Sequence, residues 1–567
     1  MTNPRRDTNR STPVTSRLGM LVILLALTFL ILVPMVFIVV GATQEGAAYT
    51  SGVTFSLDSL RTVFTTKAYL SSFAGTALLS LSVAALAVCV ASMFAWLLAR
   101  TNLPRRGLLE LIILLPLFLS PFVGAIAWVT LASRNSGIVN VTLGQVFGLS
   151  EPLVNIASTG GVVWVMVMYF IPYGYILISP ALKNMDPSLE EAGYLCGAGP
   201  LSTTLRVTIP IVRPAVLSAF FLVAVIAAGV FSIPAVLGGQ GGFTPLSVHI
   251  YRAIARPPAN YPLAAAVGCA LLLLVFVGLH LYRRAVRASS RFVTVTARGF
   301  RPRLVDLGRL RYAGVALCVG YASLAILLPY AALVLVSITP YTITDLTKLT
   351  FTLGSFQEIL TSSRVLEAVK NTMLIGVVAP TACVALAVAV SYVVERTRIR
   401  GRRALEYLAV APVAVPGIVF AVGMLWAYVR TPLYATVWIL VAVFIASYLP
   451  HASRMTGSGL LQIDRVLEDA ATVCGASRVK TLSKITVPLS KPSLLSAWIF
   501  VFVLTVREIN AAIVLYSPDT MVLSVLTWDY VEFGDFQMAA VAGLLQTALL
   551  VLGLLVGRFV FRVRLMR

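Results

Sequence analysis

Two stretches of the chain combine acidic, small and proline residues at identical spacing. In each, an acidic residue begins a short triplet, a glycine follows after three further residues, and a proline closes a four-residue segment nine residues later. Neither stretch pairs a nucleophile with a base or clusters metal ligands, so the chemistry it suggests is docking rather than catalysis. The candidate positions are Glu190, Glu191, Ala192, Gly197 and Pro210, and then Glu468, Asp469, Ala470, Gly475 and Pro488.

Each stretch predicts a helix–turn–helix elbow. Asp186 and Asp464 are good N-caps, and the acidic residues after them complement the helix dipole. Gly197 and Gly475 are placed to end that helix. A second short helix is expected to end before the proline, where a long apolar run begins. An elbow with an acidic start and a basic end suits a groove on a soluble partner; the residues alone leave an ordinary amphipathic linker open.

A third candidate is the charged pair Arg507-Glu508, which falls inside an apolar run. Charged residues within a membrane span are costly and usually face a cavity or one another. Adjacent helical positions point in different directions, so these two cannot simply pair. We expect Glu508, with Asn510, to face a central pathway or brace a gate, and Arg507 to lie toward the external end. A structural clamp between helices is the alternative.

The elements that must position these residues are membrane-spanning helices. The 567 residues are 59% hydrophobic and 12% charged, with a mean hydropathy of +0.92, which excludes a soluble protein. Lipid offers no partner for free backbone groups, so each run must be helical. Prolines in the third and ninth runs predict bent or broken helices. Twelve runs are expected: 18–40, 72–98, 107–132, 161–181, 215–237, 261–282, 313–337, 373–394, 404–427, 432–449, 493–516 and 538–560.

The net charge of +22 lies in short tracts between the apolar runs, which favours topology signals over nucleic-acid binding. With the N-terminus inside, the inner segments hold 34 of the 44 Lys and Arg residues and the outer loops nine. The first run is longer than the core of a signal peptide, so it is expected to remain as the first span. Both termini are therefore predicted to be cytoplasmic.

The chain repeats itself. Arg100-Thr101 recurs as Arg396-Thr397 at an offset of 296, whereas the two elbow stretches are 278 residues apart. The first copy thus has 18 extra residues, most simply near 134–160. Six helices per copy make a parallel repeat. The expected segments are a tail (1–17), a first repeat (18–282), a basic cytoplasmic linker (283–312) and a second repeat (313–567).

The elbow pattern resembles the coupling-loop motif, Glu-Ala-Ala, three residues, Gly, nine residues, Ile-x-Leu-Pro, of binding-protein-dependent ABC importer permeases with the type I fold. Both copies fit its spacing without gaps; Gly193, Asp469 and Val207 are mild departures. The resemblance implies an all-α polytopic permease whose elbows sit in clefts of two soluble ABC ATPase subunits. It also implies an external solute-binding protein and alternating access. The resemblance implies that ATP and Mg bind to the partner subunit and that this chain itself binds no cofactor.

Local stretches resemble the ferric-iron, thiamine and phosphonate/polyamine branch of that family. Phe231–Gly238, which contains Ser232 and Pro234, is similar to a segment that follows the first elbow in ferric permeases. Arg507–Leu515 is similar to a segment in the second copy of the ferric permeases. The resemblance implies ferric iron as the solute, with thiamine, phosphonate or polyamine as alternatives, and assigns Ser232, Pro234, Arg507, Glu508 and Asn510 to the pathway or gate.

A different class, the ion-coupled secondary transporter, also has twelve spans and charges within the membrane. It would need a coupling-ion site and would have no use for twin elbows. The chain contains no G-x-x-x-x-G-K-[ST] motif, so ATP would be hydrolysed by a partner and this chain is expected not to be an enzyme.

Overall fold

The computed structural model describes residues 14–46, 54–148, 151–186, 188–238, 244–289, 304–341, 349–397 and 399–560. These residues are almost entirely helical, with one antiparallel pair of short strands, β1 (Gln44–Glu45) and β2 (Thr54–Phe55). The predicted all-α class is confirmed. Most of the predicted N-terminal tail, and the linker between 290 and 303, lie outside the described residues.

Among the described residues, ten helices are long and apolar enough to cross a membrane, or up to twelve when two bent pairs each count as one span. The predicted number is therefore confirmed. Six of the ten are single α-helices: α4 (Lys67–Arg100), α8 (Thr159–Lys183), α14 (Tyr261–Ser289), α18 (Ser363–Arg396), α21 (Val437–Leu461) and α27 (Phe536–Val560).

The other four spans each contain a π-helical turn, directly followed by a proline at the second position of the next α-helix. A π-turn shifts the hydrogen-bond register by one residue, which accommodates a residue that has no N–H to donate. The four are α1 (Val14–Leu27), η1 (Thr28–Leu32) and α2 (Val33–Ala42); α10 (Pro200–Thr203), η3 (Thr204–Thr208) and α11 (Ile209–Gly229); α15 (Leu310–Ala322), η6 (Ser323–Leu327) and α16 (Leu328–Ser337); and α23 (Arg478–Thr481), η9 (Leu482–Thr486) and α24 (Val487–Val506).

The two bent pairs are the runs in which prolines predicted a break. In repeat one, α5 (Arg106–Leu114) and η2 (Leu115–Phe118) meet α6 (Pro121–Ala132) at 93°. In repeat two, α19 (Arg402–Val410) and η8 (Ala411–Ala414) meet α20 (Gly417–Tyr428) at 115°. Nearly all of α6 and α20 is buried, so both lie in the centre of the molecule.

The order of the elements repeats. Short helices α3 (Asp58–Thr65) and α17 (Gly354–Thr361) precede α4 and α18, and elbow helices α9 (Ser188–Leu195) and α22 (Arg465–Val473) follow α8 and α21. After each break come α12 (Ser232–Leu237) and α13 (Leu246–Ala255), or α25 (Ala512–Leu515), η10 (Pro518–Thr520) and α26 (Leu523–Glu532). Among the α-helices of the described residues, α7 (Ile138–Phe147) is the one without a counterpart, and it lies where the extra residues of the first copy were expected.

Two predicted spans are too long at their C-terminal ends. The run 215–237 ends as a helix at Gly229, and the run 493–516 ends at Val506. Polar side chains bind the backbone at each break and stop the helix there: Ser247 donates to Val230 O at 2.8 Å, and Ser524 donates to Glu508 O at 2.8 Å. Arg507 and Glu508 therefore do not share a helix, contrary to the prediction.

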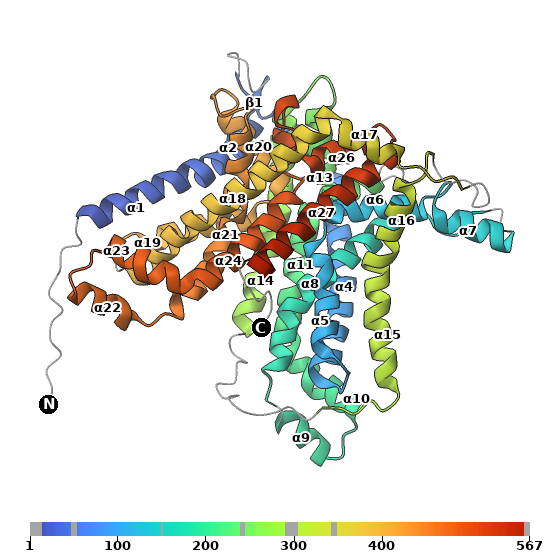
Figure 1. Cartoon of the computed structure of the whole chain (residues 1–567), viewed down its shortest axis with the longest axis horizontal. Coiled ribbons are helices and arrows are strands. Elements are labelled where there is room, and N and C mark those ends of the chain that lie inside the picture. The colour runs from blue at the N-terminus through green and yellow to red at the C-terminus, as the bar shows by residue number, and fades with distance from the viewer. Residues whose placement is uncertain are drawn as a thin grey trace.

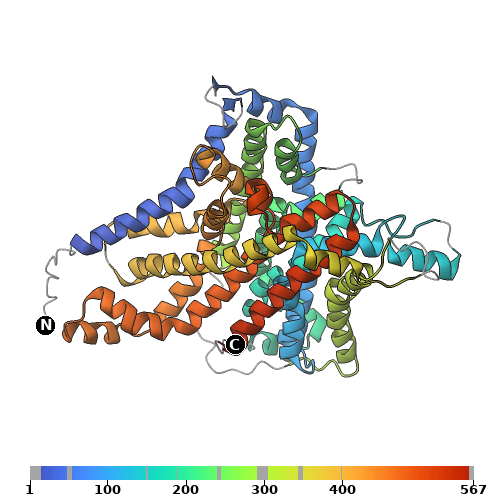
Figure 2. The ribbon, with the colours of Figure 1, turned by 45° about the horizontal axis from the view of Figure 1, so that its top comes forward.

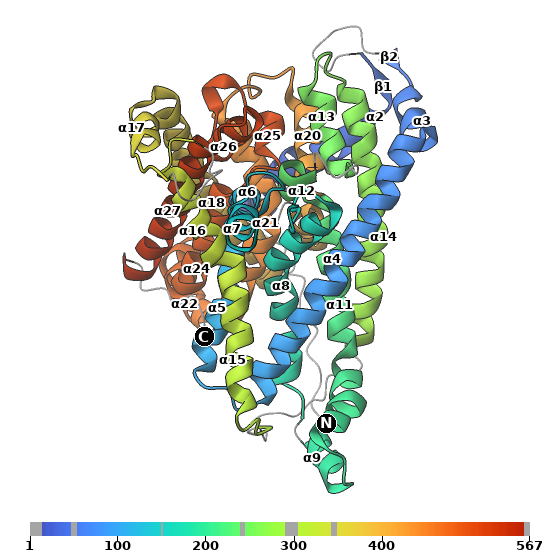
Figure 3. The same ribbon diagram turned by 90° about the vertical axis from the view of Figure 1, so that its right-hand side faces the viewer.

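We call the side of the molecule that carries α9 and α22 the elbow side, and the opposite side, where α13 and α26 lie, the far side. The helices of the two repeats diverge toward the elbow side, and α9 and α22 stand apart at its extremities (Figures 1 and 3).

The first span of each repeat packs on the bent pair of the other. The α1–α2 helix lies along α20, and α16 lies along α6 (Figures 1 and 2). Gly423 of α20 makes the first contact possible, since a Cβ there would lie 2.4 Å from Pro34 O and 2.6 Å from Ile38. The buried core therefore contains residues of both repeats, and the contact between them is not limited to their surfaces.

The linker is attached to repeat one where it re-enters the described chain. Thr101 and Val305 form a parallel β-bridge, and the Asn102 amide donates to Asp306 Oδ1 at 2.5 Å while accepting from Leu307 N at 3.1 Å. The start of the second repeat is therefore fixed next to the end of α4.

Gly423→Ala should lower the melting temperature of the purified protein in detergent, because the added methyl collides with the backbone of α2. Overpacking of this kind costs about 1–3 kcal/mol. Gly320→Ala in α15 is the matched control: its Cβ has no atom within 4 Å, so no loss is expected. Equal melting temperatures for both variants would contradict the shared core.

Candidate functional site

The two elbows begin and end in the same way. Asp186 accepts from Ser188 N at 2.9 Å, a bond that holds the pKa of this carboxyl below its ordinary value. Asp464 likewise accepts from Val466 N at 3.1 Å. The N-cap at Asp464 is as predicted from the sequence, and Asp186 makes the equivalent bond before α9.

A glycine with positive φ ends each elbow helix, at +81° for Gly197 and +78° for Gly475. The backbone bonds of a Schellman turn accompany it, from Ala198 N to Gly193 O and from Ala476 N to Ala471 O. A residue with a Cβ would be strained at either position, which explains why the pattern has glycine there in both copies.

The second part of the elbow differs from the prediction. It does not end before Pro210 or Pro488, because the π-turns η3 and η9 run without interruption into α11 and α24. Each elbow is therefore a direct extension of a membrane-spanning helix, which is a stiffer connection than the expected break.

A buried arginine anchors the first elbow. Arg100, at the end of α4, lies 3.5 Å from Glu190, and their side chains are only 2% and 11% exposed. Thr208 donates to the other carboxylate oxygen, Oε1, at 2.6 Å, and Arg100 donates to Met185 O at 3.3 Å. The carboxylate of Glu190 in α9 thus binds the end of α4 and the η3 turn that leads into α11, while Arg100 also binds the chain just after α8.

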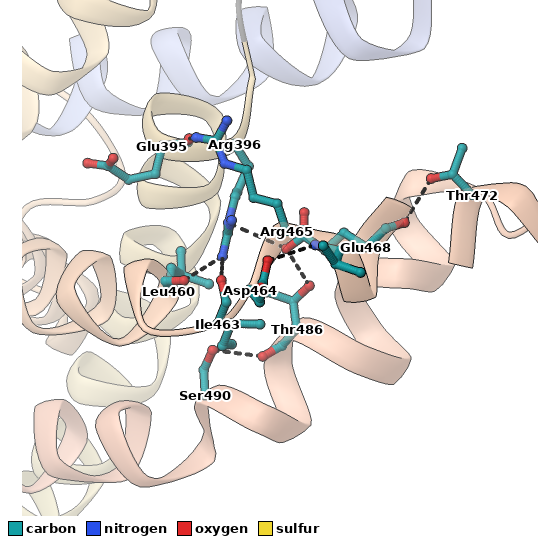
Figure 4. A network of polar contacts seen from close by, with 11 residues as sticks. Glu395, Arg396, Leu460, Ile463, Asp464, Arg465, Glu468, Thr472, Thr486 and Ser490 are labelled. Carbon is teal, nitrogen blue, oxygen red and sulfur yellow. Dashed lines mark hydrogen bonds and ion pairs between the residues drawn. The ribbon is translucent and has the colours of Figure 1, made fainter. Parts of the chain in front are cut away.

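The second elbow has the same anchor (Figure 4). Arg396, at the end of α18, lies 3.5 Å from Glu468 Oε1, which also accepts from Thr486 at 3.1 Å. Arg396 donates to the carbonyls of Leu460 and Ile463 at 2.5 and 2.6 Å. We call these sets the elbow anchors: Arg100, Glu190 and Thr208 in repeat one, and Arg396, Glu468 and Thr486 in repeat two.

The other predicted elbow residues lie at the surface. Glu191, Ala192, Asp469 and Ala470 are exposed, as are Pro210 and Pro488. At the tips, Leu195 and Val473 are 89% and 88% exposed. Each elbow therefore has one acid, buried in the first elbow and half-buried in the second, that holds it in place, and an exposed face with an apolar tip that a partner can cover.

Sequence reasoning missed the arginine and threonine of each anchor. A signal for them was present: Arg100 and Arg396 are paired by the 296-residue offset, and Thr208 and Thr486 by the 278-residue offset. An arginine and a threonine that recur at the ends of apolar runs in both copies are candidates for structural partners of the repeated glutamate.

The second candidate region lies at the helix breaks, between the repeats. Arg507, from repeat two, donates to the carbonyls of Leu117 and Leu119 of repeat one at 2.5 and 2.9 Å. These carbonyls lie at the bend between η2 and α6. Arg507 thereby satisfies backbone groups that the bend frees, rather than lying at the external end of a continuous helix.

Glu508 is bound on both oxygens. Oε1 accepts from Asn510 N and its side-chain amide at 2.8 and 2.7 Å, and Oε2 accepts from the Tyr448 hydroxyl at 2.8 Å. Asn510 Oδ1 in turn accepts from Phe231 N of the other repeat at 3.2 Å. Ser232 and Pro234 are buried in α12, next to this contact. The hydrogen bond between Asn510 and Phe231 joins the repeats. In this conformation, each hydrogen bond described for Glu508 and Asn510 is to another group of this chain.

Aromatic residues at equivalent places in α13 and α26 meet on the far side. The ring centroids of Tyr251 and Trp528 lie 5.5 Å apart, and both rings lie near Phe231, at 5.1 and 5.5 Å. Glu532 accepts from the Tyr251 hydroxyl at 3.1 Å and from Trp528 Nε1 at 3.0 Å. We call Phe231, Tyr251, Trp528 and Glu532 the far-side latch, since they bridge the repeats there.

Across the described ranges, no three His, Cys, Asp or Glu side chains gather in a way that could hold a metal ion. The region between the repeats therefore offers hydrogen bonds and aromatic contacts rather than a chelating set.

Comparisons with known proteins agree with the repeat. The sequence model of the family described as "Binding-protein-dependent transport system inner membrane component" matches residues 87–291 and again 395–564. Each match contains one elbow, which is the part of the repeat that the sequence pattern singled out.

Two curated relatives are ferric transport proteins. The chain is 29% identical over 439 residues to the ferric transport system permease protein FbpB of Actinobacillus pleuropneumoniae, which covers 76% of this chain and 62% of the relative. It is 27% identical over 517 residues to the putative ferric transport system permease protein FbpB 1 of Haemophilus influenzae (89% and 78%). A shorter match, 25% over 189 residues, is to the putrescine transport system permease protein PotI of Escherichia coli (32% and 66%).

Arg396→Gln should loosen the second elbow, because it leaves Glu468 in its partly buried place without the cation. Breaking a buried pair costs about 3–5 kcal/mol, an upper bound here because Glu468 is partly exposed. Amide hydrogen exchange should accelerate in α22 and around Ile463. Arg403→Gln, at an exposed position of the neighbouring α19, is the control. Unchanged protection in α22 would show that the anchor does not hold the elbow.

Proposed function

The chain belongs to the family of binding-protein-dependent transport system inner membrane components, and from this premise we propose that it carries ferric iron into the cytoplasm as the fused permease of a type I ABC importer. The observation that carries the proposal is the pair of elbows, each fixed to the ends of two membrane-spanning segments by an equivalent Arg–Glu–Thr anchor.

A partner ATPase is proposed to bind both elbows. Two copies of a soluble ABC subunit would cover the exposed tips at Leu195 and Val473 and would hold the ATP and Mg. Movement of an elbow would pass to α11 or α24 through the unbroken helix, and to α4 or α18 through the anchor arginine. The Lys and Arg bias of the loops supports an elbow side in the cytoplasm.

The mechanism that we propose is alternating access. In this structure the far-side latch is closed and the elbows stand apart (Figure 1), which fits a pathway open toward the elbow side. ATP binding would draw the two ATPase subunits and the elbows together. The repeats would then rock, the latch would separate, and an external binding protein would deliver its solute.

Ferric iron is supported by the two ferric relatives, which align over most of this chain. The putrescine permease shows that the family divides among solutes, so thiamine, phosphonate and polyamine remain the alternatives. With no cluster of metal ligands in the described ranges, selection of the solute would rest largely with the binding protein.

The test is purification of the tagged chain from mild detergent, with mass spectrometry of what co-purifies, followed by uptake of radioactive ferric iron into liposomes. We expect an ABC ATPase to co-purify and iron uptake to require ATP and the binding protein. ATP-dependent uptake of putrescine instead would replace the solute but keep the importer. Uptake by the chain alone under an ion gradient would identify a secondary transporter.

Gly475→Asp and Gly197→Asp should abolish ATP-driven uptake while the protein still inserts. The left-handed backbone costs a residue with a Cβ roughly 1–2 kcal/mol, and the new side chain stands in the proposed interface. Membrane content by immunoblot controls for insertion, and co-purified ATPase measures docking. Normal uptake by both variants would rule out the elbows as coupling elements.

Trp528→Phe should raise ATP hydrolysis in the absence of solute severalfold, because it removes the hydrogen bond that Trp528 Nε1 donates across the repeats to the Tyr251 hydroxyl at 2.9 Å, as well as the bond to Glu532. A hydrogen bond to a carboxylate contributes about 1.5–3 kcal/mol. Trp498→Phe is the matched control, since Trp498 Nε1 donates to Thr381 within one repeat. Equal basal rates for the two variants would exclude the latch as a gate.

A further inference from the structure

The helix α7, which only the first repeat has, is held firmly in place. The side-chain amide of Asn140 donates to Ser133 O at 2.8 Å and to Val154 O at 2.7 Å, and its Oδ1 accepts from Val154 N at 3.0 Å. One side chain thus ties the helix to the chain segments on both sides of it. These hydrogen bonds fix the position of α7 relative to the segments before and after it.

The C-terminal end of α7 is apolar and uncovered. Residues 138–144 are half-buried, whereas Val146 and Phe147 at the end of the helix are 67% and 68% exposed, as is Leu153 after it at 67%. No charged residue occurs between Gly137 and Ser150. Apolar surface left in water is unfavourable by about 25 cal/mol per Å², so this surface is expected to be covered.

The start of α7 lies at the far-side ends of three spans. Ile138 lines a small hollow together with Ser133 at the end of α6, Val336 at the end of α16 and Phe536 at the start of α27. From there α7 projects sideways, away from the helical bundle and across the direction of α15 (Figures 1 and 2). It therefore stands at the level where the spans leave the apolar layer, and outside the bundle.

We propose that α7 lies in the far-side surface of the membrane, with Val146 and Phe147 in contact with lipid acyl chains. A helix that projects from the bundle at the level of the span ends meets lipid there, and contact with acyl chains removes the exposed apolar surface of Val146 and Phe147 from water. A soluble binding protein is the other partner to weigh, but solute must enter at the latch, and α7 points away from it. The lack of charge also gives such a protein nothing to recognise electrostatically.

The experiment places a nitroxide on Phe147→Cys, in a background whose six native cysteines are replaced by Ser or Ala, in lipid vesicles. Collision with oxygen reports lipid and collision with a water-soluble nickel chelate reports water. Leu78→Cys on α4 and Phe55→Cys on β2, 68% and 76% exposed, are the controls for a membrane-spanning helix and for the far-side strand pair.

We expect the label at 147 to favour oxygen as the label at 78 does. A label at 147 that is as accessible to the nickel chelate as the label at 55 would overturn the proposal. Loss of access to both oxygen and the nickel chelate when a binding protein is added would also overturn it. Should the cysteine-free background fail to fold, Phe147→Trp in the native chain serves instead. Quenching of its added fluorescence by lipids brominated near the head group supports α7 in the membrane surface, and absence of quenching refutes it.

Discussion

Backbone groups freed inside a membrane must find partners within the protein, and much of this structure follows from that requirement. Lipid supplies no hydrogen bonds, so each bend or break needs a polar side chain close by. Thr76 and Thr372 accept from Leu246 N and Leu523 N, and they occupy equivalent places in α4 and α18. Arg507 does the same for the bend of repeat one, across the boundary between repeats. Polar residues within these apolar runs thus hold the irregular segments that surround the centre.

The elbow anchors apply the same chemistry at the membrane edge, but with charge. Glu190 and Glu468 each bind one arginine and one threonine, from segments far apart in the chain. The carboxylate joins its own elbow helix to both of these segments, whereas each threonine bond at a break joins only two segments. The elbow is consequently held at two points besides its own backbone connections and can act as a lever. The centre differs, because Arg507 and Glu508 belong to repeat two alone, so the two repeats are equivalent at their elbows but not where they meet.

The sequence predicted the class, the number of spans, the tandem repeat and the bends, because hydropathy, repeated offsets and proline each act locally. It also predicted the cap at Asp464 and the role of the two elbow glycines. It failed where distant segments decide the outcome. The ends of α11 and α24 depend on Ser247 and Ser524, which lie in later elements. The continuity through the elbow prolines depends on a π-turn, which leaves no mark in hydrophobic periodicity. Whether Arg507 and Glu508 also meet solute stays a prediction.

The exchange of first spans between the repeats bears on how the protein is made. The α1–α2 helix is synthesised first, yet the surface that it covers, on α20, comes almost 400 residues later, since Gly423 lies against Pro34. Helix α14 of the first repeat also packs on α2 and is made before α20, so α20 completes a contact surface that α14 begins. The first repeat likewise lacks the cover that α16 gives to α6 until synthesis passes the linker. Fusion of the two repeats in one chain therefore keeps each incompletely covered surface next to the repeat that covers it.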